Sequence, residues 1–214
     1  MSKRRITAVL ILAVATGITA VIAVKSGINP PVGNIIGSFC AIAVLVVFSL
    51  LLKVKDNLFY CGLIFVYCAS PVGSVLNLYR SVGPYDKIVH CFSGILLAWL
   101  ATVLLSRLFD RAVSEVRNTR LYMLLQCGFA FFFSSAGAGI WEIFEFTTDR
   151  LTGGEMQRGM VDTVTDIIAG NTGALTYCII LAVLICSGRL AERENMECGQ
   201  KFFKEKERGA LDEF

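Results

Sequence analysis

The stretch Ile35–Leu52 decides the fold: it reads IIGSFCAIAVLVVFSLLL and contains no charged side chain. An apolar helix of about 20 residues is long enough to cross the hydrocarbon core of a bilayer. Five further stretches meet or approach that length: Ile6–Val24, Leu58–Leu78, Ile88–Ser106, Leu121–Phe146 and Ile167–Gly188. The sequence therefore predicts an all-α, polytopic integral membrane protein, a helical bundle with about six transmembrane helices.

The composition of the whole chain agrees with this class. Of its 214 residues, 55% are hydrophobic and only 17% are charged. A soluble globular domain usually carries about 25% charged residues. The six spans leave too few residues for a separate soluble domain. We therefore expect a transmembrane bundle over residues 1–188 and a charged cytoplasmic tail over residues 189–214.

Lysine and arginine residues are distributed unequally between alternate connections. If the N-terminus is cytoplasmic, fifteen of the 20 basic residues lie on the inner side. The remaining five lie on the outer side: Lys25, Arg80, Lys87, Arg150 and Arg158. This bias predicts a multi-pass protein of the inner (plasma) membrane with both termini in the cytoplasm. The net charge of +3 then reflects topology, and we expect no nucleic-acid partner.

The first apolar run has a rival interpretation as a signal peptide, because Ser2-Lys3-Arg4-Arg5 resembles a charged leader. The run is longer than the usual apolar core of about 7–15 residues, and no small-x-small cleavage site follows it. We therefore expect it to be retained as a helix. The eight cysteines form no C-x-x-C pair, so we predict neither a disulfide framework nor a zinc–thiolate site.

Ionisable residues gather where three of the predicted spans meet the outer side of the membrane. They are the only histidine and seven carboxylates: His90, Asp86, Glu142, Glu145, Asp149, Glu155, Asp162 and Asp166. Such groups are costly at the margin of a membrane segment and usually mark function. Helical spacing places Glu142 and Glu145 on one face with Ala138 and Gly139, and it places Asp162 and Asp166 one turn apart. Three helices therefore direct ionisable groups to a similar depth.

Carboxylate oxygens suit hard divalent cations, and an added imidazole favours Mn, Fe or Zn over Ca. We predict that the metal ligands come from His90, Glu142, Glu145, Asp162 and Asp166, with Asp86 and Asp149 in support. His90, Glu142 and Glu145 are the candidate catalytic residues. The expected cofactor is a divalent metal (Mn, Fe, Zn or Mg) that acts on a lipid-linked or envelope-related substrate beside the lipid bilayer.

Other interpretations stay open, and whether the protein is an enzyme is among the open questions. Asp86, Asp162 and Asp166 each stand where a carboxylate can cap a helix or favour its dipole. Asp149 and Glu155 can be solvated loop acids. The whole cluster can belong to a transporter or ion-binding protein without chemistry. It can also belong to a structural membrane subunit whose acids pair internally with Lys87, Arg150 and Arg158.

Three short segments resemble a known family: Tyr85–Gly94, Trp141–Phe146 and Asp162–Asp166. Their D-x-x-x-H-x-x-x-G, W-E-x-x-E and D-T-x-x-D patterns, in this order, resemble the YjdF-like family of uncharacterised bacterial inner-membrane proteins. The resemblance covers about residues 85–175. It implies a compact helical bundle and the same site residues, without a named reaction. The D-K-x-x-H start of the first segment is also similar to VanZ-like membrane proteins.

Overall fold

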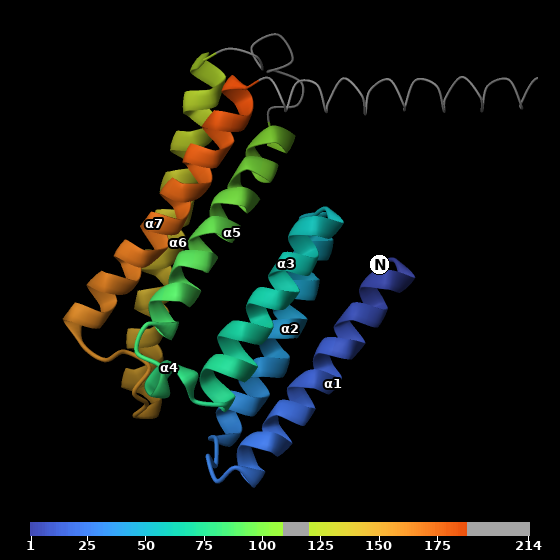
Figure 1. The fold of residues 1–214 in the computed structure, drawn as a ribbon, viewed down its shortest axis with the longest axis vertical. Helices are drawn as coiled ribbons and strands as arrows, with labels where there is room; N and C mark the ends of the chain where they lie inside the picture. Colours follow the sequence, from blue (N-terminus) through green and yellow to red (C-terminus); the bar gives the residue numbers. More distant parts are fainter. Residues whose placement is uncertain (109–119, 188–214) are drawn as a thin grey trace, which may run out of the picture.

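The structure, a computed structural model, describes residues 1–108 and 120–187, and within them every regular element is a helix (Figure 1). The elements in chain order are α1 (Lys3–Lys25), α2 (Val32–Leu51), α3 (Asp56–Tyr67), the π-helix η1 (Cys68–Val75), α4 (Leu78–Ser81), α5 (Tyr85–Leu108), α6 (Arg120–Thr152) and α7 (Met160–Cys186). Six helical segments are long and apolar enough to cross a membrane, with η1 completing the third. The predicted all-α membrane bundle is confirmed. The predicted tail, residues 189–214, lies outside the described residues.

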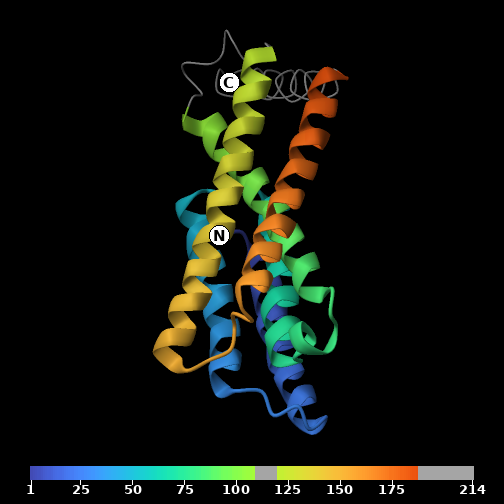
Figure 2. The same ribbon diagram turned by 90° about the vertical axis from the view of Figure 1, so that its left-hand side faces the viewer.

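The bundle is built from two halves that meet where α5 packs against α3 and η1 (Figures 1 and 2). Helices α1, α2 and α3 form the first half, around a core of Leu12, Ile42, Phe59, Leu63 and Val66. Helices α5, α6 and α7 form the second, whose core consists of small residues: Ala98, Ala101, Ala130, Ala174 and Cys178. Small side chains let membrane helices approach closely. The second half is therefore the tighter one, and it carries the ionisable cluster.

Glycines set the separation between α5 and α7. A Cβ atom at Gly94 would lie 2.0 Å from the carbonyl oxygen of Gly170, and one at Gly173 would lie 1.9 Å from that of Cys91. Both contacts are with backbone, which cannot rotate away as a flexible side chain can. Helix α6 joins the pair because the Ser134 hydroxyl donates a hydrogen bond to the Gly94 carbonyl at 3.0 Å. The close approach of α5 and α7 at these glycines also holds the preceding turns of the two helices near each other.

The third span changes geometry at its proline. Its α-helix ends at Tyr67 and continues as the π-helix η1, which contains Pro71. Proline lacks a backbone N–H, and π-helical turns inside α-helices often occur at functional sites. Asn77 then adopts a left-handed conformation (φ 62°) and starts the short helix α4. The result places Tyr79 against Gly73 at the end of the bundle that holds the ionisable cluster.

Two helices extend beyond the predicted apolar limits. Helix α6 runs to Thr152 instead of Phe146, and α7 begins at Met160 instead of Ile167. Hydropathy detects only the apolar part of a helix, whereas the backbone stays helical into the polar region on either side. Asp162 and Asp166 therefore lie inside the first turns of α7. We call this end of the bundle, with α4 and the loop 153–159 between α6 and α7, the distal end.

Candidate metal centre

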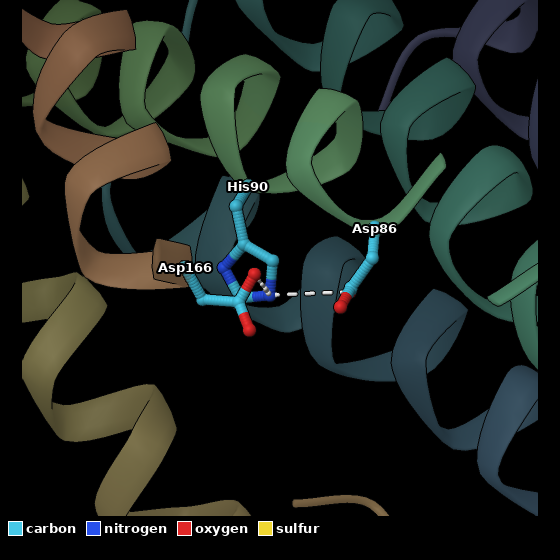
Figure 3. Close-up of side chains that lie close together, drawn as sticks. All are labelled: Asp86, His90 and Asp166. Atoms are coloured by element: carbon cyan, nitrogen blue, oxygen red, sulfur yellow. Dashed lines mark ion pairs between the residues drawn. The ribbon is translucent and has the colours of Figure 1, made fainter. Parts of the chain in front are cut away.

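Three buried side chains from two helices converge at the distal end (Figure 3). Asp86 and His90 stand one turn apart on α5, and Asp166 faces them from α7. The His90 Nε2 atom is 3.5 Å from Asp86 Oδ1 and 3.6 Å from Asp166 Oδ1. The candidate ligand atoms of the three residues all lie within 4.8 Å of one another, so a single cation can reach all three.

Lys87 supplies a positive charge to the same carboxylates. Its Nζ atom lies 2.6 Å from Asp166 Oδ1, 2.8 Å from Asp162 Oδ1 and 3.4 Å from Asp86 Oδ2. One ammonium group thereby ties the first turn of α5 to the first turns of α7. Asp162, predicted as a metal ligand, serves here as a partner of basic side chains.

Arg158 supplies a second positive charge from the loop that precedes α7. Its Nη2 forms an ion pair with Asp86 Oδ2, and its Nε lies 3.2 Å from Asp162 Oδ2. Its Nη1 donates to the Tyr79 carbonyl at 3.0 Å. Sequence reasoning treated Lys87 and Arg158 only as possible partners of the acids. Lys87 and Arg158 are among the few basic residues on the predicted outer side, which is the signal in the sequence that could have assigned them to the centre.

The centre carries more negative than positive charge. Asp86, Asp162 and Asp166 bring three carboxylates, against one ammonium group and one guanidinium group. A buried charge is costly unless a partner of opposite sign compensates it. The excess therefore favours a further positive charge, and the His90 ring lies between two of these carboxylates (Figure 3).

Glu142 of α6 adds a fourth carboxylate and so increases the excess of negative charge. It is 4% exposed, and it interacts electrostatically with Asp166, His90 and Asp162. The Thr163 hydroxyl lies near it, yet both Glu142 oxygens are buried without a hydrogen-bond partner in the described part of the chain. An unpartnered buried polar group costs about 1–3 kcal/mol, and more when it is charged. A cation or a proton at this position removes that cost.

The remaining predicted acids have other contacts. Glu145 accepts a hydrogen bond from Trp141 Nε1 at 2.8 Å and lies within electrostatic range of Glu142 and His90. Asp149 accepts hydrogen bonds from the backbone N–H groups of Met156 and Gln157, at 2.9 and 2.7 Å, so its observed role is to shape the loop. Glu155 is exposed and pairs with Arg80. The structure thus brings Asp86, predicted only in support, into the centre.

Tyr79 borders the centre and was missed by sequence reasoning. Burial, together with the nearby Asp86 carboxylate, raises the pKa of Tyr79 far above its ordinary value. The hydroxyl therefore stays protonated and able to donate a hydrogen bond at any physiological pH. No local pattern in the sequence predicts this position for Tyr79, because η1 and the left-handed Asn77 bring it to the centre.

The fold and the centre define a class: a polytopic helical membrane protein with a buried carboxylate–histidine cluster near one end. The chain belongs to the family described as "Predicted membrane protein (DUF2238)", whose sequence profile matches residues 7–187. It is also similar to an "Uncharacterized protein" of Thermotoga maritima, with 30% identity over 117 residues. That alignment covers 54% of this chain and 57% of the relative. No solved structure matches the chain. The expected likeness to VanZ-like proteins has no support in these comparisons.

Proposed function

We propose that this protein binds a divalent cation at the distal end and uses it in a reaction on a lipid or other envelope-related substrate. One observation carries the proposal: Asp86, His90 and Asp166 are buried with their ligand atoms within 4.8 Å of one another, beside the unpartnered Glu142. The basic-residue bias supports an orientation with the distal end outside. The YjdF-like resemblance supports the bacterial inner membrane as the location.

The donor set indicates which cation fits. One imidazole and two carboxylates suit Mn, Fe or Zn better than Ca, and Mg accepts the carboxylates. Three protein ligands leave coordination positions for a water molecule and a substrate oxygen. A divalent metal lowers the pKa of a bound water toward about 7 and polarises a phosphoryl or acyl oxygen. Glu142 is the buried base closest to this role, because nothing in the described residues occupies its oxygens.

A structural ion-pair network is the second candidate. Its support is the Lys87 ammonium, which contacts Asp162 and Asp166 of α7 at 2.8 and 2.6 Å and so joins two helices without any metal. Removing one partner of such a buried pair strongly destabilises a protein. In this reading divalent cations leave the stability unchanged, which separates it from the metal proposal.

The test is thermal unfolding of the detergent-purified protein in Mn²⁺, Fe²⁺, Zn²⁺, Mg²⁺ and Ca²⁺, with EDTA as reference. A ligand that binds only the folded state stabilises it by about 2.7 kcal/mol at 100 times its Kd, which corresponds to a rise in Tm of roughly 5–10 °C. We expect this rise for one of the first four ions and its loss in Asp166→Asn. The control Asp56→Asn removes a carboxylate that pairs with Arg5 far from the centre, and it should keep the rise. Equal melting in every ion and in EDTA contradicts the proposal.

Glu142→Gln should stabilise the protein without metal and reduce the stabilisation that metal gives. Without metal, replacing a buried, unpartnered carboxylate by a neutral amide should raise the free energy of unfolding, by less than about 3 kcal/mol because the amide also lacks a partner. With metal, the same variant should lose part of the stabilisation because the amide is a poorer partner for a cation. Asp56→Asn is again the control, since its carboxylate is exposed and pairs with Arg5 away from the centre. A Glu142→Gln protein that is less stable in EDTA than the wild type would count against a cation-seeking role for Glu142.

A further inference from the structure

We infer that an open pocket beside the candidate metal centre binds a phosphate group, and that metal in the centre strengthens this binding. The inference rests on the proposed function and names the chemistry of its substrate. The pocket has a volume of about 460 Å³ and is lined by Arg80, Glu155, Gln157 and Arg158. It lies between α4 and the loop 153–159, at the distal end of the membrane-spanning helices.

Arg80 is the residue of the pocket that is free to change partners. Its Nη2 atom lies 2.7 Å from Glu155 Oε2, and the side chains are 56% and 76% exposed, respectively. An ion pair that is this exposed contributes at most about 1 kcal/mol, so a competing anion can replace Glu155. A guanidinium group offers two parallel N–H donors to a phosphate, which makes arginine a preferred phosphate ligand.

Arg158 lines the pocket and also contacts the carboxylates of the centre. Two of its nitrogens hold Asp162 and Asp86, and a third donates to the Tyr79 carbonyl. In this arrangement the carboxylates neutralise Arg158, and with it Lys87. A divalent cation held by Asp86 and Asp166 compensates those carboxylates itself. Arg158, which lines the pocket, then has positive charge available for a group bound there.

The charges therefore couple the two sites. Without metal, Glu155 pairs with Arg80, and Asp86 and Asp162 pair with Arg158, which disfavours an anion in the pocket. With metal, the cation compensates carboxylates that otherwise pair with Arg158, so the two arginines that line the pocket can attract a phosphate group. Coupling between two ligands is reciprocal, so a phosphate group must also tighten the binding of the metal. An ordinary contact between surface arginines and lipid phosphate would not change the affinity for the metal.

The experiment measures the apparent Kd for Mn²⁺ of the full chain in phosphatidylcholine nanodiscs. One arm adds inorganic phosphate to the solution, and the other adds phosphatidic acid to the discs. We expect an anion to lower the Kd about tenfold in the wild type, a typical size for such coupling. Arg80→Gln should reduce the effect to less than twofold while leaving Mn²⁺ binding without the anion unchanged. Arg150→Gln, which removes an arginine that stacks on Phe146 instead of lining the pocket, should retain it.

The arms separate the possible results. An effect of inorganic phosphate supports a soluble phosphate compound, and an effect confined to phosphatidic acid supports a lipid headgroup. A Kd for Mn²⁺ that neither anion changes overturns the inference and leaves the metal proposal standing. An equal effect in Arg80→Gln also overturns it, because the anion then acts elsewhere. If none of Mn²⁺, Fe²⁺, Zn²⁺ and Mg²⁺ binds, the proposed function fails and this inference fails with it.

Discussion

Replacing Gly173 with alanine should destabilise the α5–α7 half of the bundle by about 3 kcal/mol or more. The new methyl carbon would lie 1.9 Å from the carbonyl oxygen of Cys91, and backbone cannot yield without moving a whole helix. Separating α5 from α7 also moves His90 away from Asp166, since these residues face each other across the same contact. The variant should therefore lose both thermal stability and any metal-dependent rise in Tm.

Gly139→Ala is the matched control for this prediction. Gly139 lies in α6, and an added Cβ there would meet nothing within 4 Å. Alanine is a better helix former than glycine by up to about 1 kcal/mol, so this variant should melt at or slightly above the wild-type temperature. Thermal melting in detergent compares the three proteins directly. Wild-type melting of Gly173→Ala would show that the two helices are further apart than the structure places them.

Lys87→Met should have the second large effect, and divalent metal should correct it. Removing the ammonium leaves Asp162 and Asp166 without the cation that lies within 2.8 Å of both. Breaking a buried pair in this way costs about 3–5 kcal/mol, but the Lys87 side chain is 33% exposed, so about 1–3 kcal/mol is expected. Because the ammonium no longer competes for the carboxylates, the metal-dependent rise in Tm should be larger than in the wild type.

The control for Lys87→Met is the same substitution at Lys25, an exposed residue at the end of α1. It should change neither the stability in EDTA nor the response to metal by more than a few tenths of a kcal/mol. Titration of each protein with Mn²⁺ during thermal unfolding gives both quantities. A Lys87→Met protein that is destabilised and stays so at saturating metal would favour the structural ion-pair network over a metal centre.

Hydropathy predicted most of the fold because apolar runs of this length are typical of helices that cross a bilayer. The same property misplaced the helix ends. The polar residues Asp162 to Asp166 continue α7 beyond its apolar part, and window averages do not register them. Pro71 indicates a disturbed helix, but the π-helical geometry of η1 depends on packing against neighbouring helices.

Local spacing could predict part of the centre. Asp86 and His90 are one turn apart on any helix, and Glu145 can accept from Trp141 one turn earlier. The contact of His90 with Asp166 depends on how closely α5 and α7 approach, and the glycines that permit it show their effect only in three dimensions. Which acid pairs with Arg158 depends on the path of the loop 153–159. Asp149, the nearer acid on α6, binds backbone N–H groups of that loop instead.

Binding of a metal by His90 can be measured directly because the chain contains a single histidine. Pulsed electron paramagnetic resonance of the Mn²⁺-loaded protein, purified without a histidine tag, detects nitrogen nuclei that couple to the bound metal. We predict one bound Mn²⁺ per chain with coupling to an imidazole nitrogen, and the loss of that coupling in His90→Gln. A spectrum without nitrogen coupling, or one that His90→Gln leaves unchanged, would show that His90 is not a metal ligand.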